Sequence, residues 1–164
     1  MKTQLFLYIS LLFTLTSCFS PESYKNKAKI IESMSASIEK SNSNIEHIRA
    51  SEITEEMILV DVRSEEETSV SMIKGAITQA QFLAEKEQYL GKKIVAYCTI
   101  GSRATKFAKK MKAQNIPVAN LKGGVLAWAH HSGLFVKDGI EVKKVHVLSD
   151  AWNLLPDGFQ GEVP

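Results

Sequence analysis

Short runs of apolar residues recur along the middle of the chain. Residues 57–60, 94–97 and 118–121 form such runs, the last one interrupted by Asn120. A continuous apolar run of this length is typical of a strand that is buried on both faces of a parallel sheet. We therefore predict strands at these three places.

Between these runs the apolar positions follow a helical period. The spacing i, i+3, i+4, i+7 predicts a helix that ends before Pro117; its apolar positions are Ala104, Phe107, Ala108 and Met111. Residues 82–90 and 125–131 are shorter helix candidates. Strands that alternate with helices predict an α/β fold, with a central parallel sheet flanked by helices. In such folds, reactive residues gather where strands end and helices begin.

The first 17 residues have the pattern of a bacterial export signal. Lys2 precedes an apolar run over residues 5–15, which is as long as a signal-peptide core and short for a membrane span. Leu15-Thr16-Ser17-Cys18 then resembles a lipobox, in which the cysteine receives a lipid. We predict a lipoprotein signal peptide over residues 1–17 and lipidation of Cys18. A plain secretory peptide that happens to contain a cysteine is the alternative.

Lipidation would place the protein at the cell envelope. A diacylglyceryl group plus an N-acyl chain provides stable attachment to a membrane. Phe19, and not an aspartate, follows Cys18, which favours the outer membrane, with the domain facing the periplasm. Residues 18–44 are rich in Ser, Lys, Asn and Glu, so we interpret them as a partly helical, lipid-anchored linker.

Composition and cysteine count narrow the possible chemistry. The chain has 164 residues, of which 45% are apolar, and this suits one globular domain. A net charge of +2 is too small to indicate nucleic-acid binding. If Cys18 carries lipid, Cys98 is the remaining thiol, and it is either inert and buried or chemically active. Without a spaced set of His and Cys ligands, we predict no metal and no cofactor.

The surroundings of Cys98 favour an active thiol. Cys98 follows a predicted strand, and a predicted helix begins near Ser102 or Arg103. Gly101 permits backbone conformations that a side chain would resist. Loop N–H groups around a helix start, together with the charge of Arg103, favour a thiolate. A thiolate is the nucleophilic form of cysteine, and the same loop would stabilise an anionic persulfide.

Several motifs around this loop occur in an order that resembles a single-domain rhodanese. They are Asp61-Val62-Arg63, Gly75-Ala76, Tyr97-Cys98, and Leu121-Lys122-Gly123-Gly124 followed by Ala127-Trp128. The resemblance implies a rhodanese-like, doubly wound domain over residues 45–137 and Cys98 as the catalytic, persulfide-forming residue. It also implies that the loop surrounds the transferred sulfur and that Asp61 and Arg63 support it. The substrate-binding loop residues would be Thr99, Ile100, Gly101, Ser102 and Arg103.

The resemblance implies a sulfurtransferase. Sulfane sulfur would pass from thiosulfate or another persulfide source to a thiophilic acceptor such as cyanide, a small thiol or a protein thiol. Related phosphatases have five residues between the cysteine and the arginine, whereas four residues separate Cys98 and Arg103. The shorter loop favours sulfur over phosphate. A phosphatase or arsenate reductase on the same fold, or a catalytically weak binding module at the envelope, are the alternatives.

Two features modify this interpretation. Thr99 and Ile100 are uncharged. Arg103 is therefore the one cation of the loop that could bind a dianion such as thiosulfate, and outside the loop Lys122 or Arg63 could contribute. Residues 138–164 lie beyond the usual end of the domain and carry bulky apolar residues. We predict that this extension packs on the domain, since large apolar surfaces are rarely left free, with a docking segment for a partner as the alternative.

Overall fold

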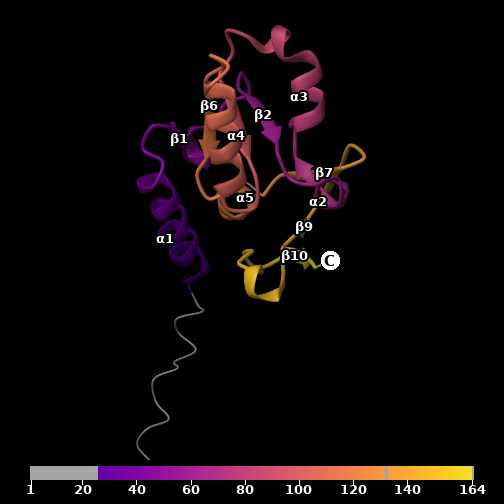
Figure 1. The fold of residues 1–164 in the computed structure, drawn as a ribbon. Coiled ribbons are helices and arrows are strands. Elements are labelled where there is room, and N and C mark those ends of the chain that lie inside the picture. The colour runs from indigo at the N-terminus through magenta and orange to yellow at the C-terminus, as the bar shows by residue number, and fades with distance from the viewer. Residues whose placement is uncertain (1–25, 132, 164) are drawn as a thin grey trace, which may run out of the picture.

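The computed structural model describes residues 26–131 and 133–163, and its centre is a parallel sheet (Figure 1). The strand order is β1-β6-β5-β2-β4. The strands are β1 (His47–Ile48), β2 (Ile58–Asp61), β4 (Ile77–Thr78), β5 (Ile94–Tyr97) and β6 (Val118–Leu121). The three predicted strands are confirmed as β2, β5 and β6. The two edge strands are only two residues long, too short to produce a sequence pattern.

Helices cover both faces of this sheet. They are α1 (Lys27–Lys40), α2 (Glu65–Val70), α3 (Gln79–Glu85), α4 (Ser102–Lys112) and α5 (Gly124–His131), with 3-10 turns at Ala50–Glu52, Lys86–Tyr89 and Asp150–Trp152. Phe82 of α3 and Phe107 of α4 lie in the apolar cluster on one face. Ile31 of α1 and Leu126 of α5 lie in the cluster on the other face. The predicted α/β fold with a central parallel sheet is confirmed.

Helix α1 packs against the domain, although the composition of residues 18–44 predicts a partly helical linker. Asn26 caps the helix by accepting a hydrogen bond from the backbone N–H of Lys29 at 3.1 Å. Ile31 is 3% exposed and belongs to the main apolar cluster. The helical spacing of Ile31 with Met34 and Ile38 gives α1 an apolar stripe, which explains why this part of the segment docks. The predicted signal peptide and Cys18 lie outside the described residues.

The C-terminal segment forms two small sheets against the domain. Strands β3 (Met72–Ile73), β7 (Phe135–Lys137) and β8 (Ile140–Val142) pair antiparallel, while β9 (Lys144–His146) and β10 (Gln160–Glu162) pair parallel. Four side chains of the segment are buried in the main apolar cluster: Val145, Val147, Leu154 and Leu155. The predicted packing of the extension on the domain is confirmed over residues 138–163.

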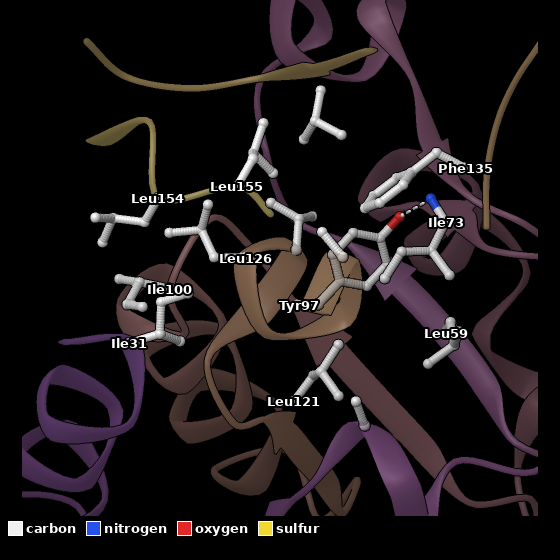
Figure 2. Packing of buried hydrophobic residues seen from close by; sticks show 14 of the residues in the cluster. Ile31, Leu59, Ile73, Tyr97, Ile100, Leu121, Leu126, Phe135, Leu154 and Leu155 are labelled. Carbon is white, nitrogen blue, oxygen red and sulfur yellow. Dashed lines mark hydrogen bonds between the residues drawn. The ribbon is translucent and has the colours of Figure 1, made fainter. Parts of the chain in front are cut away.

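The carboxyl ends of the parallel strands meet at one edge of the sheet. Strand β5 ends at Tyr97, whose hydroxyl accepts a hydrogen bond from the backbone N–H of Ile73 at 3.2 Å (Figure 2). Cys98 follows directly, and the turn Lys122-Gly123-Gly124 follows the neighbouring strand β6. The predicted reactive loop therefore lies at this edge. Among the described residues, none of the helices has the length and apolar character needed to span a membrane.

Candidate active site

The loop after β5 wraps around the sulfur of Cys98. The backbone N–H of Gly101 donates a hydrogen bond to Cys98 Sγ at 3.2 Å. Gly101 has a φ of +113°, and a Cβ at this position would lie 3.0 Å from the side chain of Asn120. The backbone conformation therefore favours glycine, and a Cβ would in addition crowd the Asn120 side chain. Cys98 itself is 2% exposed.

The start of α5 holds the carbonyl side of the loop. The backbone N–H of Val125 donates to the Cys98 carbonyl at 2.9 Å, and that of Leu126 donates to the Thr99 carbonyl at 3.3 Å. These are N–H groups of the first helical turn, which lack partners within the helix. A Cβ at Gly124 would lie 2.1 Å from the Cys98 carbonyl oxygen, so the turn and the loop touch directly. With its carbonyls bound to α5, the loop can present N–H groups to the sulfur.

A buried carboxylate fixes the end of the loop. Arg103 donates two hydrogen bonds to Glu67, from Nη1 to Oε2 at 2.5 Å and from Nη2 to Oε1 at 2.7 Å. Thr99 Oγ1 donates to Glu67 Oε1 at 3.3 Å and accepts from Arg103 at 3.1 Å. The Glu67 side chain is 5% exposed, whereas that of Arg103 is 39% exposed. Glu67 therefore connects Thr99 at the start of the loop with Arg103 at its end.

The electrostatics of this pair favour its ionised form. Burial opposes ionisation of Glu67, but hydrogen bonds from Arg103 and from the backbone N–H of Ser64 outweigh it and lower the pKa of Glu67 to about 2. The hydrogen bonds to Glu67 raise the pKa of Arg103, and the charge of a Cys98 thiolate acts in the same direction. Arg103 is thus a cation that is held by Glu67 and also interacts with Cys98.

The other predicted cations are paired elsewhere. Arg63 donates to Asp61 Oδ2 at 2.7 Å and to the Ser71 carbonyl at 2.7 Å, and both charged side chains are fully buried. Lys122 bonds Glu32 and Glu39 of α1, each at 2.9 Å. Asp61 and Arg63, predicted to support the loop, thus bind each other. Neither Arg63 nor Lys122 is available as an unpaired charge for an incoming anion.

The loop side chains between Cys98 and Arg103 point in different directions. Thr99 is 1% exposed and turned to Glu67, whereas Ile100 is 6% exposed and lies in the main apolar cluster. Figure 2 shows Ile100 beside Ile31 of α1, with Leu154 of the C-terminal segment close by. Ser102 is exposed at the start of α4. A substrate would therefore meet the backbone of residues 99–101 rather than their side chains.

Two residues near the site, Glu67 and His146, are not indicated by any sequence motif for this loop. Ser64 and Glu67 form a capping box at the start of α2, which is a recognisable helix signal. That signal gives no indication that Glu67 also binds Arg103, 36 positions further along the chain. His146 lies on β9 with Nδ1 at 3.9 Å from Glu67 Oε1. It belongs to the segment beyond the recognised motifs, so no pattern linked it to the loop.

A buried cysteine follows a parallel strand, its sulfur accepts a hydrogen bond from the Gly101 N–H, and the loop ends at an arginine; these features make Cys98 a candidate nucleophile on an α/β scaffold. The family model that matches the chain is the rhodanese-like domain, over residues 45–131. The chain belongs to the rhodanese-like domain family.

Relatives support this assignment at modest identity. The chain is 33% identical over 82 residues to a protein of Allochromatium vinosum named sulfurtransferase, which covers 48% of this chain and 77% of that protein. It is 34% identical over 80 residues to YtwF of Bacillus subtilis, also given a sulfurtransferase name, covering 47% and 78%. A rhodanese-related structure from Thermoplasma volcanium is 23% identical with a TM-score of 0.47, covering 56% of this chain and 97% of that one. Sulfurtransferase-type chemistry with small sulfur substrates is thus the activity that the family membership indicates.

Proposed function

We propose that this protein moves sulfane sulfur through a persulfide on Cys98. The observation that carries the proposal is the hydrogen bond from the Gly101 N–H to Cys98 Sγ, made inside a loop closed by Arg103. N–H dipoles and a nearby guanidinium stabilise an anionic sulfur at this position. The four-residue spacing between Cys98 and Arg103 favours a cradle of the size of sulfur over one of the size of phosphate.

The transfer takes place in two displacements. The Cys98 thiolate attacks the outer sulfur of a donor persulfide, R–S–S⁻, and the donor S–S bond breaks with its electron pair leaving on R–S⁻. Cys98 then carries a persulfide anion. An acceptor thiolate or cyanide attacks the terminal sulfur, the Cys98–sulfur bond breaks, and the Cys98 thiolate is restored. No external oxidant is needed, since in each step one nucleophile replaces another on the transferred sulfur atom.

Donors of low charge suit this site better than thiosulfate. Arg63 is neutralised by Asp61, and Lys122 is neutralised by Glu32 and Glu39. Arg103 is the cation of the loop, and its charge is shared with Glu67. A dianion would therefore approach a loop whose charge is already compensated. We propose organic persulfides, which carry a single negative charge on the reacting sulfur, as donors and small thiols or a protein thiol as acceptors.

Mass spectrometry tests the proposal directly. Incubation with glutathione persulfide should add one sulfur atom to the protein, and Cys98→Ala should remove this adduct. Lys110→Ala is a matched control, since Lys110 is exposed near the end of α4, outside the loop. Hydrolysis of an aryl phosphate without any sulfur adduct would instead favour the phosphatase alternative. Partner binding that survives Cys98→Ala, again without an adduct, would favour a binding module.

We also propose that the protein is attached to the periplasmic side of a bacterial membrane by a lipid on Cys18. The support is the sequence pattern: Lys2, an apolar run over residues 5–15, and a lipobox-like Leu15-Thr16-Ser17-Cys18. Fractionation of cells that express the full chain tests it. The wild-type protein should be found with membranes, preferentially the outer membrane, and should incorporate labelled fatty acid. A Cys18→Ser protein that keeps both properties would contradict this proposal.

A further inference from the structure

His146 is a buried imidazole with an unsatisfied nitrogen beside the catalytic loop. The residue is 6% exposed, and its Nδ1 is buried without a hydrogen-bond partner. The Glu67 carboxylate lies close by, with Oε1 at 3.9 Å from Nδ1. A buried polar nitrogen without a partner is unfavourable, so its position needs an explanation. This distance is longer than a hydrogen bond, and a small movement of either side chain would bring Nδ1 and Oε1 within hydrogen-bonding distance.

The C-terminal segment holds His146 in this position. Strand β9 packs against α2, which carries Glu67. His146 lies opposite Glu162 in the β9–β10 pair, and an ion pair between Lys144 and Glu162 joins the same two strands. Ser71 Oγ further donates to the Lys144 carbonyl at 2.6 Å. All of β9 lies outside residues 45–131, so this imidazole is an addition of this chain to the matched domain.

Glu67 is the common partner of His146 and of the loop. In the sulfur-free loop, Glu67 Oε1 accepts hydrogen bonds from Arg103 and Thr99, while Oε2 accepts from Arg103 and from the backbone N–H of Ser64. A persulfide places a new negative charge beyond Cys98 Sγ, and the guanidinium of Arg103 is the nearby group that can bind it. When Arg103 turns to the persulfide, the buried Glu67 carboxylate loses hydrogen bonds and needs another donor.

We propose that His146 is a positioning residue for the sulfur-loaded loop, because its Nδ1–H replaces Arg103 on Glu67 Oε1 when Arg103 binds the persulfide anion. His146 thereby keeps Glu67 and Thr99 in place while the arginine moves. This inference rests on the proposed persulfide chemistry of Cys98. It deepens that proposal by assigning a function to a segment outside the matched domain.

Two substitutions of His146 separate this role from a packing role. His146→Leu removes the donor, and persulfide formation from glutathione persulfide should become about tenfold slower, the loss expected for a hydrogen bond to a charged group. His146→Asn keeps an N–H near the position of Nδ1 and should restore most of the rate. The exposed His131 offers a matched control, and His131→Leu should load sulfur at the wild-type rate. Alkylation of Cys98 by neutral iodoacetamide should be equal in all four proteins.

The outcomes distinguish the two proposals. If the wild-type protein takes up no sulfur, the proposed function fails. If the wild-type protein loads and His146→Leu loads equally fast, or His146→Asn fails to restore the rate, the role of His146 is wrong and the function stands. A nitrogen NMR spectrum of wild-type His146 gives an answer that does not depend on variant folding. Its Nδ1 resonance should move to a hydrogen-bonded value on sulfur loading, and an unchanged resonance would overturn the inference.

Discussion

The carbonyl oxygens of Cys98 and Thr99 leave no space for a side chain at residue 124. A Cβ there would lie 2.1 and 2.7 Å from these oxygens, and the backbone has a φ of +52°. We expect Gly124→Ala to lower the free energy of unfolding by about 2–4 kcal/mol and to abolish sulfur loading, because the loop must move away from α5. Denaturant unfolding and mass spectrometry of the persulfide measure the two effects.

Gly75 provides the matched control for this substitution. It has a φ of +81°, but a Cβ there would meet no atom within 4 Å. Gly75→Ala should therefore cost only the backbone strain, about 1 kcal/mol, and leave loading intact. Equal stability losses in the two variants would show that contact between the turn and the loop is unimportant.

The acid stability of the protein should depend on Glu67. Its pKa is lowered from 4.5 to about 2, so its stabilising contribution is complete above pH 4.5 and is lost as the pH falls toward 2. A shift of this size corresponds to about 3 kcal/mol, and solvent around the part-exposed Arg103 reduces it to about 1–2 kcal/mol. Unfolding of wild type and Glu67→Gln should differ at neutral pH and converge in acid. A difference that stays constant over this range would contradict the ionised pair.

At the scale of elements, the sequence predicts the helices and strands whose apolar residues form a long or regular pattern. The apolar spacing of α4 and the three-to-four-residue runs of β2, β5 and β6 are visible without any tertiary information. The docking of α1 is not visible, since its apolar stripe is diluted by Ser, Lys and Glu and its partner surface comes much later in the chain. The residues of the candidate site differ in the same way in how far the local sequence predicts them. Cys98 and Arg103 share one loop, whereas Glu67 and His146 reach it only through tertiary packing.

The packing of α1 can be tested through one side chain. Ile31 is 3% exposed, and its Cγ2 lies 3.0 Å from the place of a Cβ on Gly123. Ile31→Ala should lower the free energy of unfolding by about 2–4 kcal/mol and speed hydrogen exchange in α1, because the helix loses its main apolar contact. The exposed Lys29 lies on the same helix, and Lys29→Ala should change stability by less than about 0.5 kcal/mol. Unchanged exchange in Ile31→Ala would mean that α1 is held by other contacts.

At the scale of the whole molecule, the two ends of the described chain meet. Lys27 Nζ donates to the Leu155 carbonyl at 2.8 Å, and Phe135 and Phe159 pack edge to face with centroids 6.0 Å apart. The main apolar cluster takes side chains from α1, from the matched domain and from the C-terminal segment. Because this cluster joins all three parts of the chain, we expect them to unfold as one unit, although the family match covers residues 45–131 alone.

The two tryptophans of the chain can report whether these parts unfold together. Trp128 lies on α5 within the matched domain, and Trp152 lies in the C-terminal segment. The single-tryptophan variants Trp152→Phe and Trp128→Phe should each show a denaturant transition that coincides with the loss of helical circular dichroism. Adding Leu155→Ala should lower the free energy of unfolding reported by each tryptophan by the same amount, about 2–5 kcal/mol, because Leu155 is 1% exposed in the shared cluster. Leu148→Ala, at a residue that is 42% exposed, should leave both nearly unchanged. If the Trp152 signal changes at a lower denaturant concentration than the Trp128 signal, the C-terminal segment unfolds separately. His146 would then move away from Glu67 while the matched domain stays folded.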